Sequence, residues 1–292
     1  MYRSLQEAVR DAEAQKKSLA QLALETESRD QGRPVAEIRA ALQRALDVMR
    51  GAIAQGLTGE LRSASGLVGG DAAKLHTEAA GPLADTPFRD ILSRALAVQE
   101  VNAAMGVIVA APTAGGAGVL PAVLTGLADA RKLSDEELVD ALATAGLIGA
   151  VVAERASLSG AEGGCQAETG AAAAMAAGAA TEMLGGSPTQ VVHAVALAQQ
   201  GTLGLVCDPL GGLVELPCVF RNATGAAIAL AAIEMALAGI TFAIPADEVI
   251  DTMGEIGREM DVRYRETAGG GLAATPTGRR LARERLVQIK RG

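Results

Sequence analysis

Three cysteines, Cys165, Cys207 and Cys218, are the residues of this chain best suited to metal chemistry. Each lies in or beside a loop rich in glycine or proline, in the stretches EGGCQAE, LVCDPLGG and ELPCVFRN. A cysteine that only packs is more usual within an apolar run. The loops therefore raise the question of whether the three thiols converge on one ligand.

The spacing C-x41-C-x10-C restricts what that ligand can be. Zinc sites favour short Cys pairs and a fourth ligand, and electron-transfer ferredoxins use four cysteines, several of them closely spaced. Three distant cysteines suit a [4Fe–4S] cluster in which one iron stays open as a Lewis acid for a substrate hydroxyl or carboxylate. The alternative is three unrelated buried thiols, and the spacing alone leaves both open.

Two glycine-rich loops are candidates for binding an anion. SASGLVGGD (63–71) offers backbone N–H groups and two hydroxyls just before an expected helix, which suits a carboxylate. PTAGGAG (112–118) offers a second such turn, although either loop could simply connect helices. No P-loop motif is present, which argues against ATP. The candidate carboxylate contacts are Ser63, Ser65, Gly66, Gly69, Gly70, Asp71, Thr113 and Gly115.

The elements that must position these residues are expected to be helices. Apolar residues recur at helical spacing after Pro34, residues 87–110 read as another helix, and Ser134 with Glu137 forms a capping box. No segment alternates convincingly enough to predict a strand. With 49% hydrophobic residues but no Trp, two Tyr and three Phe, the core must be built from small aliphatic side chains.

We therefore predict an all-α fold, a single large helical domain with glycine-rich active-site loops. Residues 1–57 are expected to form N-terminal helices that pack on the main domain, and residues 58–292 the helical catalytic domain.

Charge and apolar content limit the partners. The net charge of −8 argues against nucleic acid, which needs clustered Lys and Arg. Residues 170–184 are too short and too weakly apolar to span a membrane, and residues 223–244 are rich in Ala and contain Glu234, so both are predicted to be buried helices. The charged N-terminus lacks an apolar signal core, and three cysteines cannot all pair. We expect a cytoplasmic, reduced protein with no membrane partner.

Several long motifs resemble one family. GAEGGCQAETG, LGLVCDPLGGLVELPCVFRN, IPADEVIDTMGEIG and GGGLAATPTG closely resemble the α chain of iron–sulfur-dependent L-serine dehydratase. SASGLVGGD and NAAMGVIVAAPTAGGAGVLPAVL are similar to the upstream motifs of that family, so the resemblance runs from about residue 63 to about residue 278. It implies a lyase that converts L-serine to pyruvate and ammonia without pyridoxal phosphate.

The resemblance also implies roles for individual residues. Cys165, Cys207 and Cys218 match the motifs that bind the [4Fe–4S] cluster. Arg221 and Asn222 are polar residues beside them, and we expect them to hydrogen-bond the cluster sulfurs or the substrate, the alternative being that they only cap loops and satisfy backbone groups. Ser63 and Ser65 are expected to hold the substrate carboxylate and to stabilise developing charge.

The general base is harder to identify from this chain. His76, shortly after the glycine-rich loop, is a candidate, whereas His193 reads as a packed helix residue. The family's β domain carries an S-S-S-H type motif that is missing here. The resemblance therefore implies a separate β subunit that supplies a catalytic histidine, and a hetero-oligomer.

Three alternatives remain at this stage. A pyridoxal-dependent enzyme would need a Schiff-base lysine, for which only Lys74 in GGDAAK is placed, but such enzymes are α/β proteins. A serine sensor that binds the cluster without catalysis is a second alternative. The same elimination acting on threonine is a third.

Overall fold

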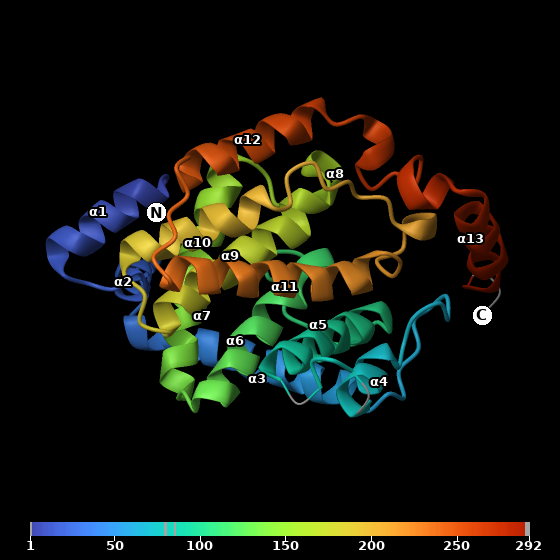
Figure 1. Cartoon of the computed structure of the whole chain (residues 1–292), viewed down its shortest axis with the longest axis horizontal. Coiled ribbons are helices and arrows are strands. Elements are labelled where there is room, and N and C mark those ends of the chain that lie inside the picture. The colour runs from blue at the N-terminus through green and yellow to red at the C-terminus, as the bar shows by residue number, and fades with distance from the viewer. Residues whose placement is uncertain (1, 79–80, 85, 290–292) are drawn as a thin grey trace.

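The computed structural model describes residues 2–78, 81–84 and 86–289 (Figure 1). Across these ranges the chain forms helices and short 3-10 or π turns, and no β-strand. A single isolated bridge joins Cys207 to Arg265. This confirms the prediction of an all-α fold.

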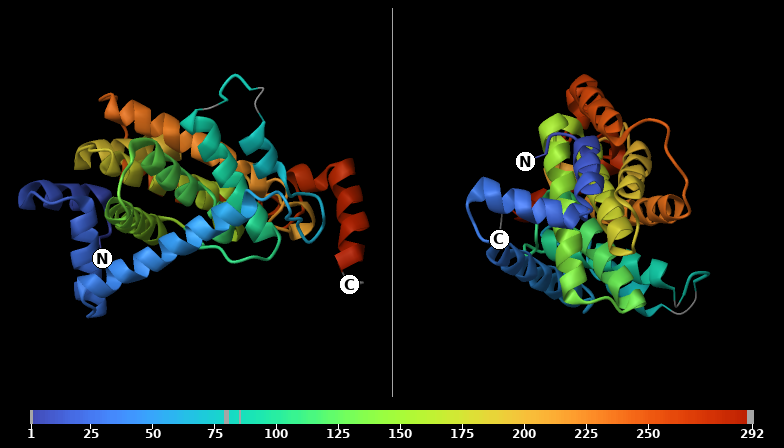
Figure 2. Two further views of the ribbon diagram at one scale, coloured as in Figure 1. Left: turned by 90° about the horizontal axis from the view of Figure 1, so that it is seen from below. Right: turned by 90° about the vertical axis from the view of Figure 1, so that its left-hand side faces the viewer.

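The main helices are α1 (Leu5–Gln15), α2 (Leu19–Gln31), α3 (Val35–Gly56), α4 (Asp71–Thr77), α5 (Pro87–Ala103), α6 (Val119–Arg131), α7 (Asp135–Arg155), α8 (Gly160–Gly163), α9 (Ala171–Met183), α10 (Pro188–Gln200), α11 (Cys218–Leu237), α12 (Ala246–Glu259) and α13 (Pro276–Ile289). The short turns are η1 (Ala114–Gly116), the π-helical η2 (Gln166–Gly170), η3 (Leu210–Gly212), η4 (Val262–Tyr264) and η5 (Gly271–Ala274). Helices α1 and α13 lie at opposite ends of the long axis (Figures 1 and 2).

Helix α9 forms the centre of the fold and is surrounded by α6, α7, α10 and α11 (Figure 1). Every residue from Ala171 to Thr181 is buried. Small side chains allow this close approach: a Cβ on Gly178 would lie 2.4 Å from Cδ1 of Ile148. The Ala-rich composition therefore determines how closely the central helices pack.

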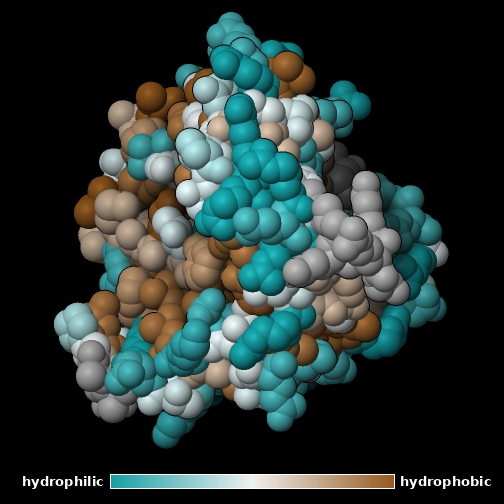
Figure 3. All heavy atoms as spheres, turned by 90° about the vertical axis from the view of Figure 1, so that its right-hand side faces the viewer, coloured by the Kyte–Doolittle hydropathy of each residue, from teal (hydrophilic) through white to brown (hydrophobic). Residues whose placement is uncertain are grey.

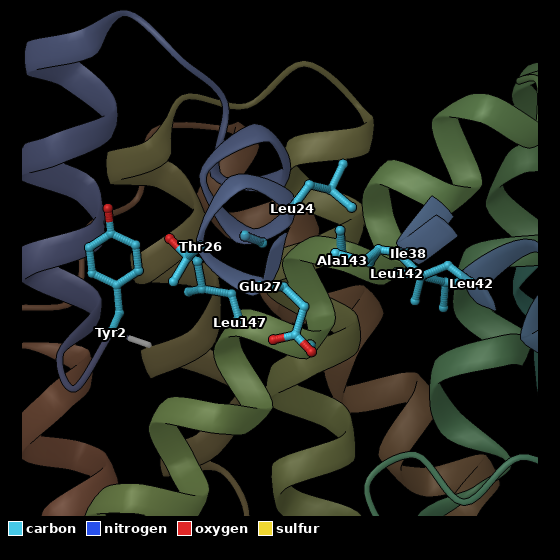
Figure 4. Close-up of a pocket in the computed structure, with 11 residues that line it drawn as sticks. Tyr2, Leu24, Thr26, Glu27, Ile38, Leu42, Leu142, Ala143 and Leu147 are labelled. Carbon is cyan, nitrogen blue, oxygen red and sulfur yellow. The ribbon is translucent and has the colours of Figure 1, made fainter. Parts of the chain in front are cut away.

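The N-terminal helices pack on the rest of the chain and share its hydrophobic core, to which Leu5 and Leu46 contribute together with α9. The backbone N–H of Leu5 donates to Asp247 in α12 at 2.8 Å, and that of Leu19 donates to Glu182 at the end of α9 at 2.6 Å. These carboxylates satisfy N–H groups that a helix start leaves unpaired. A cavity of about 240 Å³ lies between α2, α3 and α7. It is lined mainly by apolar side chains, among them Leu24, Ile38, Leu42, Leu142 and Leu147 (Figure 4).

The predicted helix over residues 87–110 is only partly correct. Helix α5 ends at Ala103, where Met105 adopts a positive φ of 62° and the N–H of Gly106 bonds back to the carbonyl of Val101 at 2.8 Å. The residues that follow are Val107, Ile108 and Val109, whose β-branched side chains lower helix propensity. The stretch before Thr113 is therefore not helical.

Helix α11 is the one helix of the described residues that is long and apolar enough to cross a membrane by length and composition. In this fold it packs against α5, α9 and α10, and it buries the side chains of Asn222, Ala226 and Ala229. The prediction of a buried helix over residues 223–244 is therefore only partly correct, because the helix ends at Leu237 and 44% of its apolar window is buried.

Apolar side chains also remain on the surface. Viewed from the end where α13 lies, they gather on the left of the molecule, while hydrophilic side chains cover the middle (Figure 3). The large hydrophobic residues with the greatest exposure are Leu83, Met105, Val107, Phe220, Ile240, Ile244, Val262 and Leu272.

Candidate active site

The fold brings Cys165 and Cys207 together from two separate segments, whereas Cys218 is not part of this close group. One ligand atom each of Cys165, Glu168 and Cys207 lie within 4.8 Å of one another, and all three side chains are buried. Cys218, the first residue of α11, is also buried. Burial raises the pKa of its thiol, and the negative charges of Cys165 and then Glu168 raise it further. Three thiols and one carboxylate therefore share a poorly solvated region.

Close backbone packing positions Cys165 and Cys207. Gly164, with a φ of 76°, precedes Cys165, and a Cβ there would lie 2.8 Å from the carbonyl oxygen of Leu205. The N–H of Cys207 donates to the carbonyl of Tyr264, and its own carbonyl accepts from the N–H of Glu266, both at 2.8 Å. The segment after α12 thus holds Cys207, and a glycine lets Cys165 approach it.

Arg221, one turn into α11, connects these segments. Its Nη1 lies 3.5 Å from Sγ of Cys165 and donates to the carbonyl of Val206 at 2.9 Å, while its Nη2 lies 2.8 Å from Oδ1 of Asp208. The hydrogen bond with Cys207 lowers the pKa of the Cys165 thiol, and the charge of Arg221 lowers it further against the opposing effect of burial. Arg221 therefore favours a thiolate at Cys165.

Glu168 is a site residue that the sequence did not single out from its polar neighbours. Its carboxylate accepts from Oγ1 of Thr113 at 2.8 Å and lies 3.8 Å from Sγ of Cys207. A Cβ on either Gly115 or Gly160 would lie 2.7 Å from its Oε2. Burial raises the pKa of Glu168 against the lowering effect of the Thr113 hydrogen bond. The signal in the sequence was a carboxylate three residues after Cys165, one helical turn on.

Asn222 contacts backbone rather than thiols. Its Nδ2 donates to the carbonyls of Gly115 and Cys218 at 2.7 and 2.9 Å, and its Oδ1 accepts from the N–H of Gly118 at 2.9 Å. The side chain thereby joins the glycine-rich turn at residues 113–118 to the helix that begins at Cys218.

The hydroxyls of the first glycine-rich loop are occupied by a carboxylate of the protein itself. Ser63 donates its hydroxyl to Glu215 at 2.7 Å, the N–H of Ser65 donates to the same carboxylate at 3.1 Å, and the hydroxyl of Ser65 also contacts it. Glu215, which the sequence analysis missed, is buried and lies three residues before Cys218. The sequence predicted that this turn binds the substrate carboxylate, and in this structure an internal carboxylate occupies its hydroxyls.

The end of the same loop binds a second internal carboxylate. Glu100 accepts from the N–H groups of Gly70, Asp71 and Ala72 at 2.8, 2.7 and 3.0 Å. Gly66 and Gly69 adopt positive φ angles of 71° and 134° that form the loop. The N–H groups at the start of α4 are thus already paired.

The candidate catalytic residues Lys74, His76 and His193 bond to groups other than the thiols. His76 lies 3.7 Å from Asp90, and its side chain is half-exposed. His193, within α10, accepts from the N–H of Phe242 at 3.3 Å, as suits a packed helix residue. Lys74 is exposed and pairs with Asp71 at 2.8 Å. Neither histidine has a hydrogen bond or ion pair to a cysteine among the described residues.

Comparison with known proteins adds a family match. Residues 14–273 match the family model described as serine dehydratase alpha chain. A Bacillus subtilis (strain 168) protein named probable L-serine dehydratase, alpha chain is 52% identical over 82% of this chain and 80% of that protein. The L-serine dehydratase alpha chain of Peptoniphilus asaccharolyticus is 40% identical over 91% of this chain and 92% of its own length. The L-serine dehydratase of Streptomyces coelicolor is 43% identical over 93% of this chain and 60% of that protein.

Proposed function

This chain belongs to the serine dehydratase alpha chain family, and we propose that it converts L-serine to pyruvate and ammonia as the α chain of a two-chain cytoplasmic enzyme. The reaction removes the α-proton and the β-hydroxyl of serine as water. The aminoacrylate that remains tautomerises to an imine, and a second water hydrolyses the imine to pyruvate and ammonia. The family match carries this proposal.

We further propose that Cys165, Cys207 and Cys218 bind a [4Fe–4S] cluster. The donor set supports this: all three thiols are buried, and the guanidinium of Arg221 lies 3.5 Å from Sγ of Cys165, where it offsets part of the thiolate charge. Burial raises the pKa of Cys218, and thiolate charge that is buried without a partner is costly, so these thiols suit a bound cation. When bound, the cluster would supply a Lewis-acidic iron for the serine hydroxyl.

The remaining residues are proposed to shape the site around those thiols. Arg221 orients Cys165 and Cys207 by holding Val206 and Asp208, and Asn222 holds the turn that carries Thr113 and Gly115. Thr113 in turn fixes the carboxylate of Glu168 beside Cys207.

The substrate-carboxylate contacts proposed from the sequence remain a prediction. Ser63 and Ser65 can receive a substrate carboxylate only if Glu215 gives up its hydrogen bonds to them. Because His76 and His193 bond elsewhere, we propose that the separate β chain supplies the histidine that takes the α-proton.

The test is metal analysis and turnover on anaerobically prepared protein. We expect about four irons and about four sulfides per chain, and pyruvate from L-serine when the β chain is present. Replacing Cys218 with Ala should abolish iron retention, whereas Thr224→Ala on the exposed face of the same helix should retain it. Turnover of serine by iron-free protein would refute the cluster, and full iron retention by Cys218→Ala would refute the ligand assignment.

A further inference from the structure

The non-helical segment between α5 and the active-site turn is apolar and exposed. Residues 106–110, Gly-Val-Ile-Val-Ala, run without a turn or a bend. Val107 is 74% exposed, and Met105 just before it is 86% exposed. Ile108 packs against a cluster that includes Ile53 of α3 and Val101 of α5. Val109 also packs against the main core, so Ile108 and Val109 anchor the segment to the fold while Val107 and Ala110 are exposed to solvent.

Apart from the bond from Gly106 to Val101, the backbone of this segment has no hydrogen-bond partner among the described residues. Within the part of the chain that the structure describes, no N–H or C=O group of residues 107–110 bonds to another protein group. Buried groups of this kind are almost always paired, whereas in an exposed segment they remain free to bond to water or to a partner chain. Because the described residues form no sheet, the fold offers the segment no strand with which to pair.

The composition of the segment suits a β-strand. Three consecutive β-branched residues favour that conformation, and no charge or proline interrupts residues 105–111. Proteins usually protect an exposed strand edge with such residues, since it invites pairing with another chain. Here the usual protection is missing.

We propose that residues 106–110 dock an extended segment of the separate β chain by β-strand addition, with backbone hydrogen bonds between the two chains. This inference rests on the two-chain enzyme proposed above. In the Streptomyces coelicolor relative named L-serine dehydratase the match covers 60% of the protein, so further polypeptide accompanies the matching portion there.

The position of the segment favours this partner over a second copy of the chain. Residues 106–110 lead through Pro112 to Thr113, whose hydroxyl bonds Glu168 beside Cys207. A β chain docked here would lie next to a site that has no histidine of its own among its hydrogen-bonded groups. A second copy paired through the same segment would complete the backbone hydrogen bonds. It would add no new histidine, however, because its His76 and His193 have the same partners within their own chain.

Hydrogen exchange resolved to single amides tests the proposal. In a paired edge strand only alternate residues direct their N–H groups at the new neighbour. We therefore expect the amides of either Val107 and Val109, or Ile108 and Ala110, to exchange at least about tenfold more slowly in the mixture of α and β chains than in the α chain alone. Unchanged exchange at all four amides in an active complex would overturn the docking site and leave the proposed function intact.

Two proline variants test the same point by binding. Val107 and Ala110 belong to opposite alternating sets, and neither amide has a bond within the chain to lose. One of Val107→Pro and Ala110→Pro should weaken β-chain binding about tenfold or more, since proline removes the donor. The other should change it little, and the controls Val107→Thr and Ala110→Ser, which keep the donor, should bind as wild type. Circular dichroism melting should be the same for all four.

Two other outcomes would overturn the docking proposal. Equal binding by both proline variants would show that the segment is not the docking strand. Protection that grows with α-chain concentration in the absence of the β chain would assign the segment to a second copy. If the α chain neither binds the β chain nor makes pyruvate in its presence, the result would count against the proposed function in addition to the docking site.

Discussion

Ser63 and Glu215 lie 152 residues apart in the chain, yet the serine hydroxyl donates to the glutamate at 2.7 Å in a buried contact. Ser65 adds its N–H to the same carboxylate at 3.1 Å. Because Glu215 directly precedes the Leu216–Pro217–Cys218 sequence, this carboxylate joins the first glycine-rich loop to one of the three thiols. A substitution of Glu215 should therefore affect the positions of both the loop and Cys218.

Replacing Glu215 with Ala should lower the free energy of unfolding by about 2 kcal/mol, because it leaves buried hydroxyl and N–H donors without an acceptor. Glu215→Gln should cost less, since its amide keeps one acceptor oxygen. Urea titration measures both, with Glu255→Ala on the exposed face of α12 as the control. A Glu215→Ala protein as stable as that control would show that the contact contributes nothing.

Arg221→Lys should destabilise the chain by about 1–3 kcal/mol. A lysine cannot reach Cys165, Val206 and Asp208 at once, since only a guanidinium presents several donors in a fixed plane. Arg263→Lys is the matched control, because Arg263 pairs with Asp261 at the surface, where such pairs contribute little. Thermal unfolding of the two variants compares them directly, and equal melting temperatures would contradict the bridging role.

Gly164→Ala should cost more stability than Gly204→Ala. Both glycines have similar positive φ angles, 76° and 80°, so both variants lose about 1 kcal/mol to backbone strain. A Cβ on Gly204 meets nothing within 4 Å, whereas one on Gly164 would lie 2.8 Å from both Leu205 and Met260. We expect an additional loss of about 2 kcal/mol for Gly164→Ala, together with weaker iron retention as Cys165 shifts. If the two variants unfold at the same urea concentration, close packing is not the reason that residue 164 is a glycine.

The raised pKa of Glu168 predicts a pH dependence for the metal-free chain. In the folded chain burial favours the protonated carboxyl, so the folded protein binds more protons than the unfolded one between the unfolded pKa and the higher folded pKa. The contribution of Glu168 to stability is therefore fully present below the unfolded pKa and is lost as the pH rises through the folded pKa.

Glu168→Gln should remove this dependence and raise the stability of the metal-free chain at pH 7.5 relative to wild type. Urea unfolding at pH 5 and pH 7.5 in the presence of a chelator measures the difference, with Glu255→Gln as the control. If Glu168→Gln loses as much stability between pH 5 and pH 7.5 as wild type does, the pH dependence arises from another group.

Local contacts were the predictable part of the fold. The capping box at Ser134 and Glu137 was read from the sequence, and the structure has both of its bonds, at 3.3 and 2.7 Å. A helix start can be predicted this way because its partners are three residues apart. The helix expected over 87–110 ended early because the packing of Ile108 and the bond from Gly106 to Val101 outweighed the apolar pattern.

Long-range contacts explain what the sequence left open. The glycines indicated two anion-binding turns, but nothing local indicated that Glu100 and Glu215 both bind the first of them. The sequence did not single out Gly160, which leaves space for the carboxylate of Glu168, because a Cβ there would lie 2.7 Å from Oε2. Such roles depend on neighbours that only the folded chain brings together.

Helix α9, whose buried residues are mostly alanines, directly follows the π turn that starts after Cys165. An alanine has no side-chain torsion to rearrange, so this part of the core cannot absorb a disturbance by switching rotamers. If a residue packed against α9 is displaced, the backbone of α9 itself must move. The thiol of Cys165, one turn away, would move with it. The central helix thus ties the position of Cys165 to the packing of the whole bundle, and substitutions far from the thiols that shift α9 would also move Cys165.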